Sequence, residues 1–100
     1  MPGRVPLDAS VVASERQLST TLADEVIILG LDDSIYYGLT GTGARIWELL
    51  QAPRTIEEIV GIIVSEFDVD RGRVELDLDA LLADLQSRGL IAITRTPINR

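Results

Sequence analysis

The chain of 100 residues contains no cysteine and no histidine. It therefore cannot form a disulfide, bind a metal through thiolate or imidazole ligands, or use a Cys–His or Ser–His pair for nucleophilic catalysis. Aromatic residues are few, at 4% of the chain, whereas apolar residues as a whole make up 46%. We expect a single domain whose core is built mainly from Leu, Ile and Val.

Basic residues are also scarce, with 9 Lys and Arg against 16 Asp and Glu and a net charge of −7. Nucleic-acid backbones and anionic membrane surfaces both favour basic partners. No apolar run approaches the roughly 18 residues of a membrane helix, and the first ten residues lack the apolar run of a signal peptide. These absences predict a cytoplasmic protein that binds neither nucleic acid nor membrane. A peptide, a protein or a cation is the expected partner.

Both ends of the chain have the composition of mobile termini. Residues 1–10 include two prolines and a glycine, and residues 95–100 include Pro97. We expect a flexible N-terminus over 1–10, one ordered domain over 11–94 and a flexible C-terminus over 95–100.

Three segments in the first half of the chain favour β-strands. Val11–Leu18 contains β-branched residues, and they dominate Glu25–Leu29. Asp32 and Asp33 are good turn formers, so Ile35–Leu39 is expected to return as the second strand of an antiparallel hairpin.

Three helices are expected after a break at Thr40–Gly43, where Thr42 or Thr40 is the N-cap. Ala44–Gln51 has apolar residues at helical spacing, including Trp47 as a core residue, and Pro53 ends it.

The second and third helices carry clearer boundary signals. Thr55 opens the second helix with a capping box, in which Glu58 is the third helical residue. The apolar stripe of the third helix starts at Val74, after a polar break at Asp70–Arg73, and Gly89 follows as a C-terminal glycine. A short strand over residues 90–94 closes the domain.

This order of elements predicts an α+β fold with a three-stranded antiparallel sheet followed by three helices. Helices two and three followed by a strand form a winged helix-turn-helix-like arrangement. A DNA-binding regulator is therefore an alternative. It is less favoured, because residues 73–88 hold two arginines against four acidic residues, and DNA phosphates would repel them.

Two features could hold an extended peptide. Alternation places Ile35, Tyr37 and Leu39 on one face of their strand, and an edge strand can accept a further strand. On the third helix, Ala80 lies in a shallow apolar strip with Leu76 and Ala83. Each feature also has a purely structural explanation, as a core hairpin and as residues of high helix propensity.

No residue set points to catalysis or to a bound ion. The acidic residues between positions 68 and 79 lack the spacing of an EF-hand loop, and Gly41–Gly43 lacks the lysine of a phosphate-binding loop. The sequence predicts no enzymatic activity, no metal site and no cofactor.

Five segments, taken in order, resemble the PqqD-like family, also called RiPP recognition elements. They are VIIL at Val26–Leu29, YYGLT at Tyr36–Thr40, TGARIWELL at Thr42–Leu50, TIEEIV at Thr55–Val60 and VELDLDALLADLQSRGLI at Val74–Ile91. Their order and spacing carry the resemblance, which covers about residues 25–93.

The resemblance implies that the leader segment of a ribosomally synthesised precursor peptide adds to the sheet as a strand and lies against the third helix. The implied peptide-binding residues are Ser34, Ile35, Tyr36, Tyr37, Gly38, Leu39, Arg73, Val74, Asp77, Ala80, Leu81 and Asp84. The chain is most similar to the stand-alone proteins of split lasso-peptide pathways. Such a protein delivers the precursor to a separate leader peptidase, and an ATP-dependent cyclase closes the ring. A PqqD-type peptide chaperone for another modified-peptide pathway is the alternative.

Overall fold

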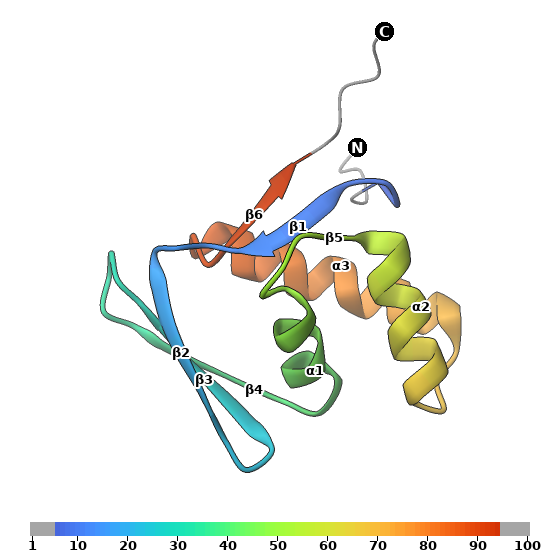
Figure 1. Ribbon diagram of the computed structural model, residues 1–100, viewed down its shortest axis with the longest axis horizontal. Helices are drawn as coiled ribbons and strands as arrows, with labels where there is room; N and C mark the ends of the chain where they lie inside the picture. The colour runs from blue at the N-terminus through green and yellow to red at the C-terminus, as the bar shows by residue number, and fades with distance from the viewer. Residues whose placement is uncertain (1–5, 95–100) are drawn as a thin grey trace, which may run out of the picture.

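The computed structural model describes residues 6–94, and Figure 1 shows the arrangement of their helices and strands. The predicted C-terminal tail and residues 1–5 of the predicted N-terminal tail lie outside the described residues. Within the rest of that N-terminal segment, Ala9 is buried and Ser10 begins a strand. The strands are β1 (Ser10–Ala13), β2 (Gln17–Leu22), β3 (Glu25–Gly30), β4 (Tyr36–Thr40), β5 (Arg54–Thr55) and β6 (Ile91–Thr94). The helices are α1 (Gly41–Leu49), α2 (Ile56–Glu66) and α3 (Arg71–Ser87).

The strands form two antiparallel sheets, with the orders β2-β3-β4 and β5-β1-β6. The first sheet, followed by three helices, confirms the predicted α+β arrangement, and β6 follows α3 as the wing. The single predicted strand Val11–Leu18 is wrong, because the chain turns after β1 and enters the other sheet as β2. In that turn the Arg16 amide donates to Ser14 Oγ over 2.9 Å.

A tight turn joins β3 to β4. The Ser34 amide donates to the Gly30 carbonyl over 2.9 Å, and the Ile35 amide donates to Asp33 Oδ1 over 3.0 Å. Ser34 has a φ of 60°, which closes the turn in the left-handed region. Strand β4 therefore begins at Tyr36, one residue later than predicted, and Ser34 and Ile35 belong to the turn.

Helix α1 begins directly after Thr40, one of the two N-caps that the sequence left open, and not after Thr42. Thr40 is its extended N-cap, and its side chain makes no capping hydrogen bond. Gly41, with a φ of 60°, turns the chain directly from β4 into the helix. The predicted break at Thr40–Gly43 is therefore wrong, and the helix ends at Leu49 rather than at Gln51.

The other two helices begin at side-chain caps. Thr55 Oγ1 accepts from the Glu58 amide over 3.1 Å, and Glu58 Oε1 accepts from the Thr55 amide over 2.9 Å, which confirms the capping box. Asp70 Oδ2 accepts from the Arg73 amide over 3.1 Å, so α3 begins at Arg71 and the predicted polar break is its first turn. Gly89, with a φ of 73°, follows the end of α3 as predicted.

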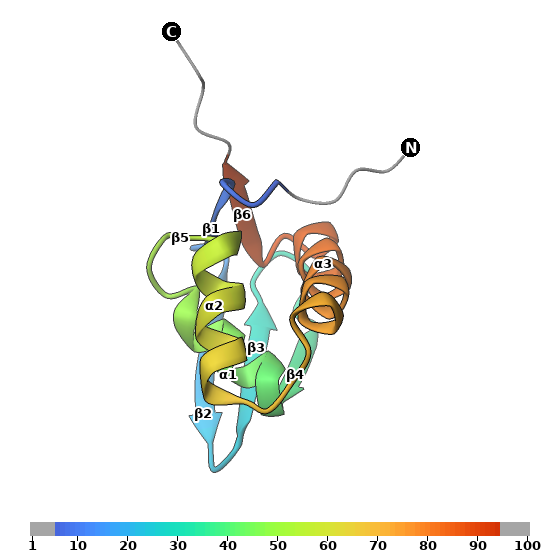
Figure 2. The same ribbon diagram turned by 90° about the vertical axis from the view of Figure 1, so that its right-hand side faces the viewer.

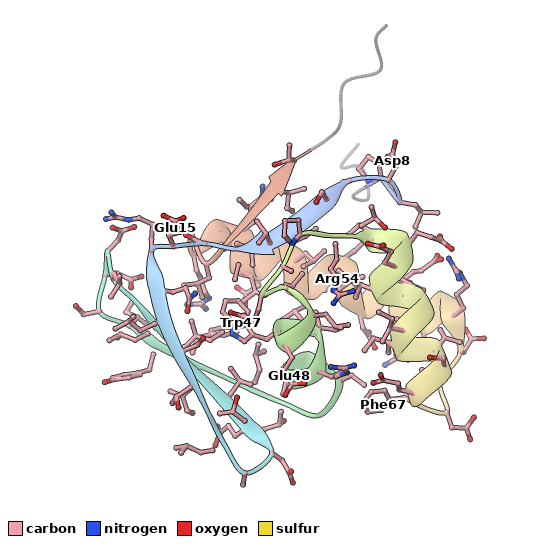
Figure 3. The ribbon with its side chains drawn as sticks, viewed as in Figure 1. Asp8, Glu15, Trp47, Glu48, Arg54 and Phe67 are labelled. Atoms are coloured by element: carbon pink, nitrogen blue, oxygen red, sulfur yellow. The ribbon has the colours of Figure 1, made fainter. Side chains whose placement is uncertain are left out.

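The core lies between the inner face of the β2-β3-β4 sheet and the three helices. Trp47 is 2% exposed, as predicted for a core residue, and its Nε1 donates to Ser19 Oγ over 3.1 Å. Figure 3 shows this side chain reaching from α1 toward the sheet. The largest fully buried side chains are Val11, Val26, Ile28, Leu50, Ile59, Val60, Ile63, Leu78, Leu82 and Leu85. None of the helices within residues 6–94 has the length and apolarity needed to cross a membrane.

Candidate functional site

Strand β4 is an edge of its sheet, because β3 is the only strand within residues 6–94 that pairs with it. The Gly30 amide donates to the Ile35 carbonyl over 3.0 Å, and this bond fixes which residues of β4 face β3. Because backbone groups alternate in direction along an antiparallel strand, Tyr36, Gly38 and Thr40 direct their N–H and C=O groups away from β3. All three residues are exposed. The edge therefore offers a row of backbone donors and acceptors to an incoming strand.

Helix α3 lies on the β4 side of this sheet, whereas β2 forms the opposite side (Figure 2). Tyr37, on the inner face of β4, donates a hydrogen bond from its hydroxyl to Asp84 Oδ2 of α3. The Arg88 guanidinium lies 4.8 Å from the centre of the Tyr37 ring, and its Nε donates to Asp84 Oδ1 over 3.2 Å. These three side chains link the edge strand to the helix beside it.

The pKa values of Tyr37 and Asp84 are shifted in opposite directions in this cluster. Burial, followed by the hydrogen bond to Asp84, raises the pKa of the Tyr37 hydroxyl. The same hydrogen bond lowers the pKa of Asp84, partly offset by burial and assisted by the positive charge of Arg88. A protonated phenol facing an ionised carboxylate is therefore the stable arrangement at neutral pH.

A hollow of about 230 Å³ lies between the start of α1 and the first half of α3, and we call it the α1–α3 hollow. Its lining is Thr42, Gly43, Ile46, Val69, Arg73, Val74, Asp77, Leu78 and Leu81. Ile46, Val74 and Leu78 are buried core residues that form an apolar floor. Arg73 and Asp77 form an exposed ion pair at 3.2 Å on its rim. The hollow suits an apolar side chain whose backbone stays near solvent.

A second hollow, at the other end of β4, is almost filled, with a volume of about 10 Å³. Tyr37 and Arg88 contribute to its lining, together with Ile35 and the β3–β4 turn. Large side chains therefore find room near the end of β4 where α1 begins, and little room near its start.

The structure brings most of the predicted site residues to this region, but not all of them in the expected way. Tyr37 meets Asp84, and Arg73, Val74, Asp77 and Leu81 line the α1–α3 hollow. Leu39 is buried under the sheet. Ala80, with Leu76 and Ala83, is exposed and lies outside the linings of both hollows, so the shallow strip faces away from the core.

Sequence reasoning missed two residues of this region. Arg88 was not among the predicted site residues, yet its guanidinium lies over the Tyr37 ring. The helical spacing of Asp77, Leu81, Asp84 and Arg88 places them on one side of α3 and could have revealed it. Ile46 was not among the predicted site residues either, and no signal in the sequence distinguishes a core residue from one that also forms the floor of a hollow.

Residues 25–91 match the family model described as Coenzyme PQQ synthesis protein D (PqqD). This chain belongs to the PqqD family. The solved structure "TbiB1 in Complex with the TbiA(beta) Leader Peptide" is 40% identical to it, with a TM-score of 0.76, over 80% of this chain and 93% of that one. A second structure, "Lasso peptide synthetase B1 complexed with the leader peptide", is 21% identical with a TM-score of 0.72, over 82% and 96% of the two chains, and shares the fold. No curated protein matches the chain.

Proposed function

We propose that this protein binds the leader segment of a ribosomally synthesised precursor peptide as an added strand on β4. It then delivers the precursor to a separate leader peptidase and an ATP-dependent cyclase in lasso-peptide biosynthesis. The observation that carries this proposal is the open edge of β4 beside the α1–α3 hollow. TbiB1, at 40% identity, was solved in complex with a leader peptide, which supports the same ligand class here.

The geometry suggests how such a peptide would bind. Backbone hydrogen bonds to Tyr36, Gly38 and Thr40 would supply affinity that is independent of sequence. Side chains of an added strand alternate between two faces, so every second one would point to the same side as Tyr37 and Leu39, toward α3. An apolar side chain on that face, near the start of α1, would fill the α1–α3 hollow.

We propose that the protein binds the peptide and does not catalyse a reaction on it. The groups that face the open edge are backbone amides, a phenol, carboxylates and guanidinium groups. Asp77 and Asp84 on α3 are each paired with an arginine, Arg73 and Arg88, so they are suited to orienting a peptide. A cytoplasmic location and the absence of nucleic-acid partners stay predictions from composition.

The family description favours one alternative, a PqqD-type chaperone for a precursor peptide of another modified-peptide pathway. The binding surface would be the same, and only the peptide and the downstream enzymes would differ. DNA binding has less support, because Arg71 and Arg73 at the start of α3 are both paired with acidic side chains.

Fluorescence anisotropy tests the proposal. The labelled TbiA(beta) leader peptide is titrated with this protein, beside a labelled DNA duplex. We expect saturable binding of the leader at physiological salt and none of the duplex. Saturable binding of the duplex, with no binding of the leader by the folded protein, would contradict the proposal.

A further inference from the structure

Strand β2 forms the second edge of the β2-β3-β4 sheet, on the side away from α3 (Figure 2). Five of its six residues are exposed, and its sequence, QLSTTL, contains neither a charged residue nor a proline. Exposed edge strands usually carry charges, prolines or bulges that prevent pairing with another strand. Because β2 carries neither a charge nor a proline, its outer edge is open to pairing with another strand.

The direction of its backbone groups is fixed by the neighbouring strand. The Leu31 amide donates to the Arg16 carbonyl over 3.0 Å, in register with the β2–β3 ladder. Because the direction of the backbone groups alternates along a strand, the N–H and C=O groups of Leu18, Thr20 and Leu22 point toward β3. The N–H and C=O groups of Ser19 and Thr21 point out of the sheet.

The side chains of β2 on the outer face of the sheet are Leu18, Thr20 and Leu22, an order that is the same in both directions along the strand. Leu18 and Leu22 are 63% and 62% exposed, and Thr20 lies midway between them. If two copies of β2 pair antiparallel about Thr20, Leu18 of each copy lies opposite Leu22 of the other. The same register sets the outward backbone groups of Ser19 opposite those of Thr21, so the hydrogen bonds and the apolar pairs agree.

Other registers do not achieve this agreement. Of the registers that preserve the hydrogen bonding, a two-residue shift sets Leu18 or Leu22 opposite Thr20 and leaves no Leu–Leu pair, and a four-residue shift leaves one Leu–Leu pair in place of two. In the register centred on Thr20, each Leu–Leu pair is a non-hydrogen-bonded pair, in which facing side chains come closest. Beyond the ends of β2, the same register brings Arg16, which pairs with Asp32 of its own copy, toward Asp24 of the other copy.

We infer that β2 is the contact between two copies of this chain, which form a two-fold dimer with one continuous six-stranded sheet. The inference goes beyond the proposed function and does not depend on it. In this dimer both β4 strands stay at the outer edges of the sheet. Each dimer can therefore hold two peptide strands, one beside each α3.

Sedimentation equilibrium at physiological ionic strength, which screens the net charge of −7, tests the dimer. We expect a mass of twice 10.9 kDa at high protein concentration. The double variant Leu18→Lys, Leu22→Lys sets lysine opposite lysine twice, and it should weaken self-association by about 100-fold. The matched variant Leu18→Lys, Leu22→Glu sets lysine opposite glutamate at both places, and it should remain a dimer.

A third variant, Thr21→Pro, removes an outward N–H without touching the bonds between β2 and β3, and it should also yield monomers. A monomeric wild-type protein at every concentration would overturn the inference. Equal association of the Lys/Lys and Lys/Glu variants would overturn it as well, because the register would then be different. Circular dichroism checks that each variant is folded, and leader binding by the Lys/Lys monomer should equal that of the wild type.

Discussion

Tyr37 in β4 donates a hydrogen bond to Asp84 in α3, across 47 positions of the chain. Arg88 lies over the Tyr37 ring and pairs with the same carboxylate. These contacts connect β4, which we propose receives the peptide, to α3, which we propose forms the wall of the peptide site. They hold the two elements at a fixed spacing before any peptide binds, which lowers the cost of ordering the site.

Tyr37→Phe should lower the free energy of unfolding by about 0.5–1.5 kcal/mol, because Asp84 loses a hydrogen-bond donor. Tyr36→Phe is the matched control, since Tyr36 is 69% exposed on the outer face and should change stability little. Urea unfolding followed by circular dichroism measures both. Equal stability of the Tyr37 variant and the wild type would show that the bond contributes nothing.

The acidity of Asp84 predicts how its contribution depends on pH. Its pKa is lowered in the folded state, chiefly by the hydrogen bond from Tyr37. The stabilisation is therefore present above the unfolded pKa of about 3.9 and is lost as the pH falls through the lower folded value. We expect Asp84→Asn to have a lower Tm than the wild type at neutral pH, with the difference shrinking in acid. A difference that grows as the pH falls would contradict this assignment.

Gly38→Pro should abolish most peptide binding, because it removes an outward backbone donor at the centre of the open edge. The loss should be about 10-fold or more, as expected for one or more backbone hydrogen bonds. A Cβ at this position meets the flexible, exposed end of the Glu25 side chain, which can move aside. Thr21→Pro on the other edge of the sheet is the control and should bind peptide normally. Anisotropy titration compares the two, and equal affinities would place the peptide elsewhere.

Asp77→Lys should weaken peptide binding more than it affects folding. Asp77 lies on the rim of the α1–α3 hollow, and its exposed pair with Arg73 contributes at most about 0.5 kcal/mol to stability. Glu15→Lys makes the same charge change in the exposed connection between β1 and β2, at a distance from the hollow (Figure 3). Titration of both variants separates a local effect from one of net charge. The prediction fails if the two variants lose affinity equally.

Trp47→Ala should lower the free energy of unfolding by about 3–5 kcal/mol, since the side chain is buried and fills the core beneath the sheet. Thr55→Ala, which removes one half of the capping box of α2, should cost about 1 kcal/mol. Chemical denaturation followed by circular dichroism gives both values. A smaller loss for Trp47→Ala than for Thr55→Ala would contradict the packing described here.

Much of the fold could be predicted because its signals are local. The capping box at Thr55, the glycine after α3 and the two aspartates of the β3–β4 turn each act within a few residues. The division of Val11–Leu18 into two strands could not be predicted, because it depends on pairing with β3 and β6, which are distant in the chain. The choice between Thr40 and Thr42 as the N-cap of α1 stayed open, because Gly41 adopts a left-handed conformation that the sequence permits but does not require.

Part of the candidate site could likewise be predicted from local signals, and part could not. Alternation along β4 was enough to place Tyr37 and Leu39 on the inner face. The contact of Arg88 with Tyr37 depends on how α3 lies against the sheet, and a single sequence carries no direct signal for that. Ala80 was included because small residues leave room for a ligand; it is exposed and lines neither hollow, so its part in binding stays a prediction.

Amide hydrogen exchange measured by NMR, with and without the leader peptide, tests the central claim most directly. In the free protein the amides of Tyr37 and Leu39, which face β3, should be protected, whereas those of Tyr36, Gly38 and Thr40 should exchange rapidly. If the leader adds as a strand to β4, these last three amides become protected when it binds. Saturable binding that leaves all three exchanging rapidly would contradict strand addition at this edge.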